Sequence, residues 1–214
     1  MNEKKLIEIL NILKEEYPKW DAPAKKFEKA YQRTPYTILL SALLSTRTKD
    51  ETTLKAIQNL LKLAKEPKEM IKLKEEQIQK AIYPVGFYKT KAKAILDLSK
   101  TLIEKYEGEV PSDKKELLKL KGVGEKVANI VLEYAFDKPC SAVDTHVHRI
   151  LNLLEIVDTK EEKETSKVIN ETLQPKYLKN LNKILVSFGQ AICQPQKPKC
   201  EICPIETKCP KNIS

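Results

Sequence analysis

The stretch Leu120–Phe136, LKGVGEKVANIVLEYAF, places two glycines between two apolar helical patterns. Gly122 and Gly124 permit a left-handed turn and a close approach of the backbone to a ligand. The amides at the start of the next helix, Glu125–Phe136, face outward where the helix dipole favours an anion. A helix pair joined by such a hairpin can grip DNA phosphates without reading sequence. The alternative is an ordinary turn between helices with a glycine cap, because Gly-x-Gly alone is weak evidence.

Helical periodicity prevails on both sides of this turn, and the alternation typical of strands is hard to find. Thr34 and Pro35 mark a helix start and open the nearly all-apolar run 36–44, the pattern of a central buried helix. Asp113 and Glu116 have the spacing of a capping box. We therefore expect an all-α fold. Further helix signals are N-caps at Asn2, Asp50 and Asp144, a helix that ends before Pro84, one that follows Gly86, and two between Lys163 and Gln190.

Length and charge narrow the class of protein. A chain of 214 residues fits one domain or two small ones, and its 41% hydrophobic residues suffice for a packed core. Lys and Arg number 39 against 30 Asp and Glu, and the net charge of +9 favours a polyanionic partner. Apolar runs fall short of the roughly 18 residues of a membrane span, and the charged N-terminus is unlike a signal peptide. We expect a cytoplasmic protein whose thiols stay reduced.

Four of the five cysteines lie in the last 22 residues of the chain. Their spacing, C-x6-C-x2-C-x5-C, predicts a metal site, because short proline-containing spacers let four sulfurs meet at one centre. The spacing suits a cubane iron–sulfur cluster at least as well as zinc, so both metals remain open here. Cys140 lies far off in sequence and is expected to be a small buried hydrophobe. The four candidate ligands are Cys193, Cys200, Cys203 and Cys209.

Two residues near the hairpin have more than one interpretation. Lys126 is the third residue of its helix if that helix begins at Gly124. It is a solvated lysine in the simplest reading. Alternatively it is a nucleophile, because the positive helix end disfavours an ammonium. Asp144, in the segment SAVDTHVHRI, is read from the residues alone as an N-cap.

Three segments together resemble a known family. LKGVGEKVANIVLEYAF, then SAVDTHVHRI, then the four-cysteine tail are similar to endonuclease III, the iron–sulfur branch of the helix-hairpin-helix DNA glycosylases of base excision repair. The resemblance extends upstream through PVGFYKTKAKAI and PYTILLSALLSTRTKD. It covers the chain from about Pro35 to Cys209.

The resemblance implies two helical domains with a DNA cleft between them. Residues 28–137 would form a six-helix barrel that carries the helix-hairpin-helix at about 113–136. Residues 1–27 and 138–214 would form a discontinuous helical domain that includes the cluster loop 193–209. The protein would act as a monomer on damaged double-stranded DNA, away from membranes and associated with the nucleoid.

The resemblance also assigns roles to residues. Lys126 falls on the family's catalytic lysine and Asp144 on its catalytic aspartate. The four cysteines fall on the ligands of a [4Fe–4S] cluster that orders a basic DNA-contacting loop. In that loop Lys197, Lys199 and Lys208 are the candidate contacts.

The implied activity is a DNA glycosylase with abasic-site lyase activity. Lys126 would form a Schiff base with the sugar, and β-elimination would cut the strand 3′ to the lesion. Relatives that only remove a base usually lack a lysine there, so we expect a bifunctional enzyme acting on oxidised pyrimidines. The alternatives are a monofunctional mismatch glycosylase and a non-catalytic helix-hairpin-helix DNA-binding protein with a structural metal knot.

Three positions depart from the family pattern or bear on it. Lys121 stands where the family often has proline, and it is expected to add a phosphate contact to those of Gly122, Val123 and Gly124. Arg47 stands where a bacterial member has glutamine filling the gap left by the extruded base. Phe87 occupies the position of an apolar wedge, with a core aromatic as its alternative.

Overall fold

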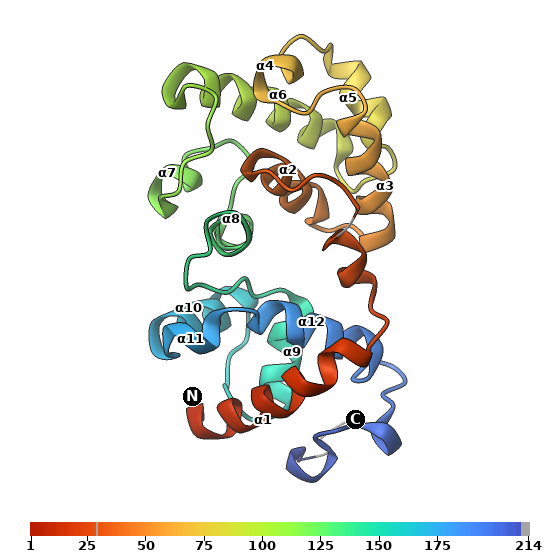
Figure 1. Cartoon of the computed structure of the whole chain (residues 1–214), viewed down its shortest axis with the longest axis vertical. Helices are drawn as coiled ribbons and strands as arrows, with labels where there is room; N and C mark the ends of the chain where they lie inside the picture. The colour runs from red at the N-terminus through yellow and green to blue at the C-terminus, as the bar shows by residue number, and fades with distance from the viewer. Residues whose placement is uncertain (29, 211–214) are drawn as a thin grey trace. The chain divides into compact units, whose positions relative to one another are not determined.

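The structure is a computed structural model that describes residues 1–28 and 30–210, and every regular element in that part of the chain is helical (Figure 1). The expected all-α class is confirmed. The chain folds into two compact units. One unit comprises Met1–Lys26 and Pro139–Ser214, and the other comprises Phe27–Lys138. We call them the split unit and the central unit.

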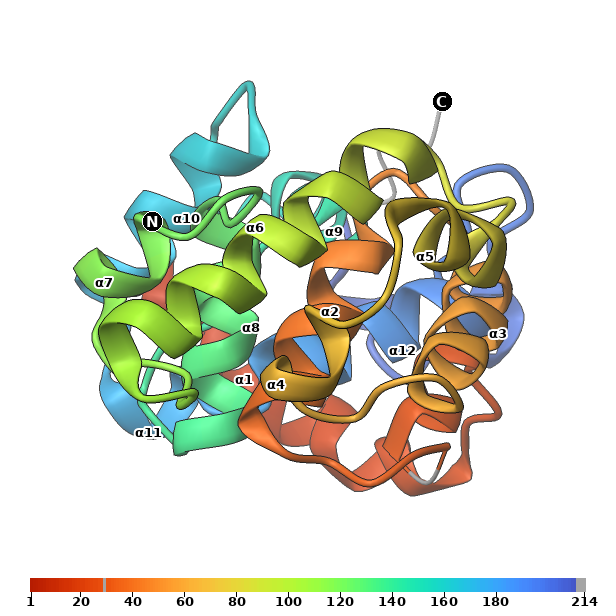
Figure 2. The same cartoon turned by 90° about the horizontal axis from the view of Figure 1, so that it is seen from above.

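The central unit is built around helix α2 (Pro35–Ser45). The Thr34 hydroxyl accepts from the backbone N–H of Thr37, and the Thr37 hydroxyl accepts from that of Thr34, which fixes the start of the helix. All nine residues from 36 to 44 are buried, as the apolar run predicts. Figures 1 and 2 show α2 flanked on one side by α3 (Asp50–Leu61) and on the other by α8 (Glu125–Phe136).

The remaining helices of the central unit complete this core. Helix α6 runs over 19 residues, Tyr88–Tyr106, and packs against α2, α4 and α5. Its Ser99 hydroxyl lies 2.7 Å from the Tyr36 hydroxyl, so the buried phenol of α2 has a partner. The shorter helices are α4 (Pro67–Met70), α5 (Glu75–Ile82) and α7 (Lys114–Leu118).

One helix start and one capping box differ from the sequence prediction. The N-cap of α3 is Lys49, and Asp50 is its first helical residue, where a carboxylate favours the positive helix end. At α7, Asp113 accepts from the backbone N–H groups of Lys115 and Glu116 as expected. The capping box is incomplete, because the Glu116 carboxylate instead accepts from the Tyr106 hydroxyl at 2.8 Å.

The split unit buries the apolar stripe of α1 (Glu3–Glu16) against α12 (Leu181–Ala191). Asn2 caps α1 as predicted, since its side chain accepts from the Lys5 N–H at 3.2 Å. Helix α9 (Thr145–Leu153) packs on α12 and on α10 (Glu162–Thr172). A third element, α11 (Pro175–Leu178), interrupts what we expected to be two helices, because Pro175 starts a new helix at its first position. The 3₁₀ turns η1 (Tyr17–Lys19) and η2 (Pro23–Glu28) follow α1.

The C-terminal tail contributes two residues, Cys193 and Ile205, to the core of the split unit. Two 3₁₀ turns, η3 (Cys200–Ile202) and η4 (Glu206–Lys208), shape it. Ile205, between them, is only 1% exposed and belongs to the same apolar cluster as Phe188. No helix in the described part of the chain is long and apolar enough to cross a membrane.

Candidate functional site

The hairpin between α7 and α8 has the backbone that its glycines predict. Gly122 has φ +82°, in the left-handed region that L side chains rarely adopt. A Cβ there would lie 3.2 Å from both the Leu43 and Ala94 side chains, so the turn packs directly on α2 and α6. Gly124 is extended and forms the N-cap of α8 without a side chain to cover the first amides of that helix. Both glycines are exposed, which leaves this end of α8 accessible to an anion.

Lys126 is the second residue of α8, because the helix begins at Glu125, as predicted for the helix 125–136, and Gly124 is its N-cap. Its side chain is partly exposed beside the hairpin. Glu125 points elsewhere: its carboxylate lies 2.6 Å from the Lys114 ammonium, which belongs to α7. Lys121 is exposed in the turn itself. The hairpin thus presents two lysines near free helix amides.

Arg47 and Phe87 come from different loops of the central unit but lie together. The Arg47 guanidinium is 5.6 Å from the centre of the Phe87 ring. Both residues are exposed, Phe87 by 61%, so the alternative of a core aromatic is wrong. Both also have left-handed backbones, with φ +52° and +58°. The wedge and gap-filling roles stay predictions.

Asp144 lies in the split unit, at the N-cap of α9. Its Oδ1 accepts from the backbone N–H of Val147 at 2.9 Å. The side chain is partly exposed, which leaves the second carboxylate oxygen available for another interaction. The structure therefore confirms that Asp144 is the N-cap of α9. Because Asp144 and Lys126 belong to different units, their proximity stays a prediction.

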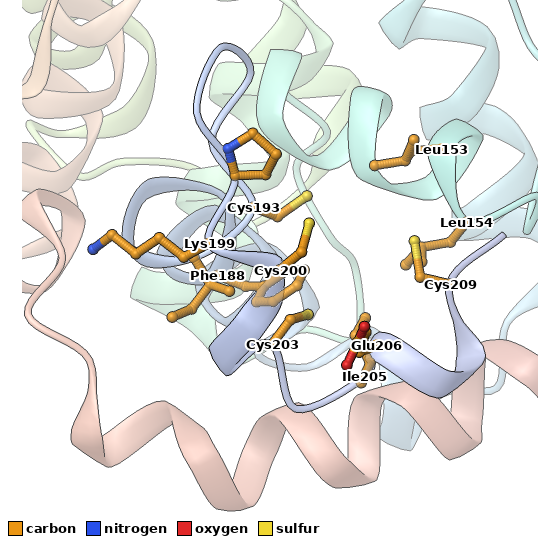
Figure 3. A pocket seen from close by; sticks show the side chains of 12 residues that line it. Leu153, Leu154, Phe188, Cys193, Lys199, Cys200, Cys203, Ile205, Glu206 and Cys209 are labelled. Atoms are coloured by element: carbon orange, nitrogen blue, oxygen red, sulfur yellow. The ribbon is translucent and has the colours of Figure 1, made fainter. Parts of the chain in front are cut away.

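The four tail cysteines line one cavity of the split unit, whose other walls are largely apolar. Figure 3 shows Cys193, Cys200 and Cys203 along the tail and Cys209 beside Leu154 of the α9 end. Phe188, Ile192 and Ile205 contribute further apolar surface. Among the described residues no disulfide joins any of the five cysteines, and Cys140 is half-buried, so it is not the buried hydrophobe expected.

Burial dominates the chemistry of the cavity thiols. It raises the pKa of the Cys193 thiol, although hydrogen bonding from Arg149 acts in the opposite direction. Burial likewise raises the pKa of Cys203. Among the described residues no three His, Cys, Asp or Glu side chains are close enough together to hold one metal ion. Four soft sulfur donors around one apolar cavity nonetheless fit the donor set of an iron–sulfur cluster.

Polar contacts tie the tail to the helices. The Arg149 guanidinium of α9 donates to the Cys193 carbonyl oxygen and lies 3.7 Å from its sulfur. The Lys208 ammonium pairs with Glu8 of α1 at 2.8 Å. Lys197 and Lys199 are exposed, so of the three candidate tail lysines these two carry free charge at the surface.

Lys91 is a buried charged residue that the sequence prediction missed. Lys91 of α6 is only 7% exposed, and its ammonium donates to backbone and hydroxyl oxygens at the end of α2. Its position offered a signal, because Lys91 precedes Ile95, Leu98 and Leu102 at helical spacing on the buried side. In so lysine-rich a chain, that single interruption of an apolar stripe was not distinctive.

Comparison with known proteins adds an independent line of evidence. The family described as "HhH-GPD superfamily base excision DNA repair protein" matches residues 40–175. Endonuclease III of Thermotoga maritima is 44% identical over 186 residues, which is 86% of this chain and 87% of that protein.

Two solved structures have the same fold. A non-covalent endonuclease III–DNA complex superposes with a TM-score of 0.87 at 29% identity, covering 99% of this chain and 96% of that one. A trapped endonuclease III–DNA covalent intermediate, described as an estranged-adenine complex, gives a TM-score of 0.81 at 32% identity, with 96% of each chain covered.

Proposed function

Since this chain belongs to the HhH-GPD superfamily of base excision DNA repair proteins, we propose that it removes oxidised pyrimidines from duplex DNA through a Schiff base on Lys126. It is a DNA glycosylase with abasic-site lyase activity, the class to which its endonuclease III relatives belong. The observation that carries the assignment to Lys126 is its place two residues after Gly124, at the accessible start of α8.

The chemistry requires a nucleophilic amine. A damaged base must leave the helical stack before any side chain can reach its sugar. The Lys126 amine then attacks C1′, and the base departs with the electrons of its bond to C1′. The nitrogen lone pair next breaks the C1′–O4′ bond, O4′ takes up the proton that the amine loses, and the resulting iminium acidifies the C2′ proton. Loss of that proton and of the 3′ phosphate cuts the strand by β-elimination. Water or a hydroxyl cannot form the iminium, so a monofunctional glycosylase would not need Lys126.

Asp144 would support this reaction electrostatically. Its carboxylate stabilises the positive charge that develops on the sugar and assists proton transfer. The N-cap hydrogen bond to Val147 occupies one oxygen and fixes the orientation of the other. This role needs an approach to Lys126 across the boundary between the two units, as the resemblance implies.

The hairpin would hold the DNA backbone. The exposed turn at Gly122 and Gly124 would bring the phosphate to the positive end of α8, and Lys121 adds a charge beside it. Val123 is buried and its N–H donates to the Leu120 carbonyl at 3.1 Å, so it would serve the contact by holding the turn. Arg47 and Phe87 would occupy the space that the extruded nucleotide leaves, since guanidinium and phenyl planes both stack on bases.

Cys193, Cys200, Cys203 and Cys209 would hold a [4Fe–4S] cluster. When bound, the group supplies a structural crosslink that orders the loop and takes no part in base removal. Deprotonation of the buried thiols would accompany its binding. Lys197 and Lys199, exposed on that loop, are the proposed phosphate contacts. Iron with acid-labile sulfide in the purified protein supports this assignment, whereas zinc without sulfide contradicts it.

The test of the proposed function is borohydride reduction in the presence of duplex DNA with thymine glycol or an abasic site. Wild type is expected to give a covalent adduct, and Lys126→Ala is expected to bind the same DNA without giving one. Wild type that binds normally but forms no adduct would contradict the lyase. Strand nicking that needs alkali, on a mispaired duplex, would favour the monofunctional alternative.

The remaining proposals concern the oligomeric state, the DNA substrate and the location in the cell. We expect a monomer acting on damaged duplex DNA, which size-exclusion chromatography with and without DNA would test. The cytoplasmic, nucleoid-associated location is proposed because the substrate of a DNA repair enzyme is the chromosome, and fluorescence microscopy of the tagged protein with a DNA stain would test it.

A further inference from the structure

The buried ammonium of Lys91 lies at a junction of the central unit. It donates to the Leu44 carbonyl at 2.9 Å, to the Thr46 carbonyl at 2.6 Å and to the Thr48 hydroxyl at 3.3 Å. Three acceptors match the three protons of an ammonium. An ammonium without such partners would be costly to bury, so the contacts explain why Lys91 is tolerated in the core. All three acceptors lie at the C-terminal end of α2 and in the turn that follows it.

Thr48 extends this junction to a second loop. Its hydroxyl accepts from the backbone N–H of Gly86 at 3.1 Å and donates to the Thr46 carbonyl at 3.2 Å. The two loops also touch directly, because a Cβ on Gly86 would lie 2.5 Å from the Arg47 carbonyl oxygen. Lys91 and Thr48 therefore join the turn at 46–48 to the loop at 85–87.

Each of the joined loops carries an exposed residue with a left-handed backbone. Arg47 follows Thr46, and Phe87 follows Gly86. A left-handed conformation costs an L residue roughly 1–2 kcal/mol, so it persists only where the surroundings determine it. The Lys91 contacts flank Arg47 on both sides in sequence, and the Thr48 contact immediately precedes Phe87.

We propose that Lys91 is a positioning residue for duplex distortion: through Thr46 and Thr48 it holds the Arg47 turn and the Phe87 loop as one rigid unit. Both side chains are then preorganised for the gap beside the extruded nucleotide, which lowers the cost of ordering them on DNA. The proposal rests on the proposed function, because it assigns Lys91 to the extrusion step and not to the covalent step.

Two observations favour positioning over core filling or catalysis. Burial lowers the pKa of Lys91 to about 8, and the nearby charge of Lys126 adds to this effect. If Lys91 only filled the core, an apolar side chain of equal length would favour folding more than this buried charge does. Catalysis by Lys91 itself is disfavoured, because its hydrogens are committed to three oxygens.

The test compares substrates that do and do not need distortion. The first is thymine glycol in a fully paired duplex. The second is an abasic site in a one-nucleotide bulge, which has no base on the opposite strand. Lys91→Met, of similar length but without donors, is expected to lose about 10- to 100-fold in excision from the duplex. Its borohydride trapping on the bulge should stay within about threefold of wild type. Lys93→Met removes an exposed charge from the same helix and should change neither activity.

A second variant and a second readout guard against a folding defect. Thr48→Val removes the hydroxyl that joins the two loops and should repeat the loss on the paired duplex alone. With 2-aminopurine opposite the lesion, wild type should raise the fluorescence by unstacking it, and both variants should raise it less.

The outcomes separate this proposal from the function on which it rests. Equal losses on both substrates, or an unchanged rate on the paired duplex in both variants, would overturn the positioning role of Lys91. Wild type that cannot be trapped on either substrate would instead overturn the lyase itself.

Discussion

At the scale of single residues, Asp144 combines two functions that a substitution can separate. Its Oδ1 caps α9 by accepting from Val147, and its charge is proposed to stabilise the reacting sugar. Asparagine caps helices about as well as aspartate but carries no charge. Asp144→Asn should therefore keep the melting temperature and slow single-turnover base release by about 10²- to 10⁴-fold.

The matched control is Asp144→Ala, which removes cap and charge together. It should lower the free energy of unfolding by about 1 kcal/mol in addition to slowing the reaction. If Asp144→Asn excises bases at the wild-type rate, the electrostatic role is wrong and Asp144 is only a cap.

Lys91 gives a prediction about pH and stability. Folding lowers its pKa from 10.5 to about 8. Below that value both the folded and unfolded chains carry the charge, so the cost of burying it is felt in full. Between about pH 8 and 10.5 the unfolded chain binds more protons at this site, and stability therefore rises with pH there. The difference in free energy of unfolding, Lys91→Met minus wild type, should become less positive across that window in urea titrations. A constant difference would contradict the buried charge.

Residue-scale prediction from the sequence worked where the signal is local. Asn2 and Thr34 cap their helices as expected, since capping depends on neighbours within one turn. Asp50 was misplaced by one position, because an acidic residue serves equally well inside the first turn. The exposure of Phe87 depends on contacts between distant segments, and no local pattern encodes it. The burial of Lys91 was signalled only by its place in the apolar stripe of α6, which is weak evidence in a lysine-rich chain.

At the scale of elements, the hairpin contains two glycines whose replacement by alanine should affect the stability of the protein differently. Gly122→Ala puts a side chain at φ +82° and within 3.2 Å of Leu43 and Ala94. It should lower the free energy of unfolding by about 1–2 kcal/mol and weaken duplex binding, because the turn that presents the amides is displaced.

Gly124→Ala is the control in the same turn. Gly124 is extended, and a Cβ there meets nothing within 4 Å. Its effect on stability should be clearly smaller than that of Gly122→Ala, as judged by chemical denaturation. Equal destabilisation by the two substitutions would mean that the left-handed turn is not what requires glycine here.

The bounds of a helix were predicted best where the sequence carries clear helix-starting or helix-ending residues. The helix at Glu125–Phe136 was predicted to the residue, because a glycine precedes it and its apolar period is clear. The region between Lys163 and Gln190 contains an additional short helix that begins at Pro175, because proline can open a helix as well as end one. The cysteine spacing predicted a shared site, and the four thiols do line one cavity.

At the scale of the whole molecule, the proposed active centre draws on both units. Lys126 belongs to the central unit and Asp144 to the split unit, only 18 positions later in the chain. Each was located by a local motif: a glycine hairpin for one, a helix cap for the other. Their joint function followed only from the resemblance of the whole chain, because periodicity cannot fix how two units assemble.

The net charge of +9 belongs to the whole molecule and governs affinity for any duplex. Neutralised phosphates release counterions, so the logarithm of the binding constant should fall linearly with the logarithm of salt concentration.

Lys197→Ala and Lys199→Ala should each reduce the steepness of that line by about 1 if each contacts a phosphate. Lys105→Ala is the matched control, since it is exposed near the end of α6 about 27 Å from Phe87. Fluorescence anisotropy with an undamaged and a lesion-bearing duplex would measure the slopes. An affinity independent of salt would contradict phosphate binding, and equal slopes for wild type and both loop variants would remove Lys197 and Lys199 from the DNA interface.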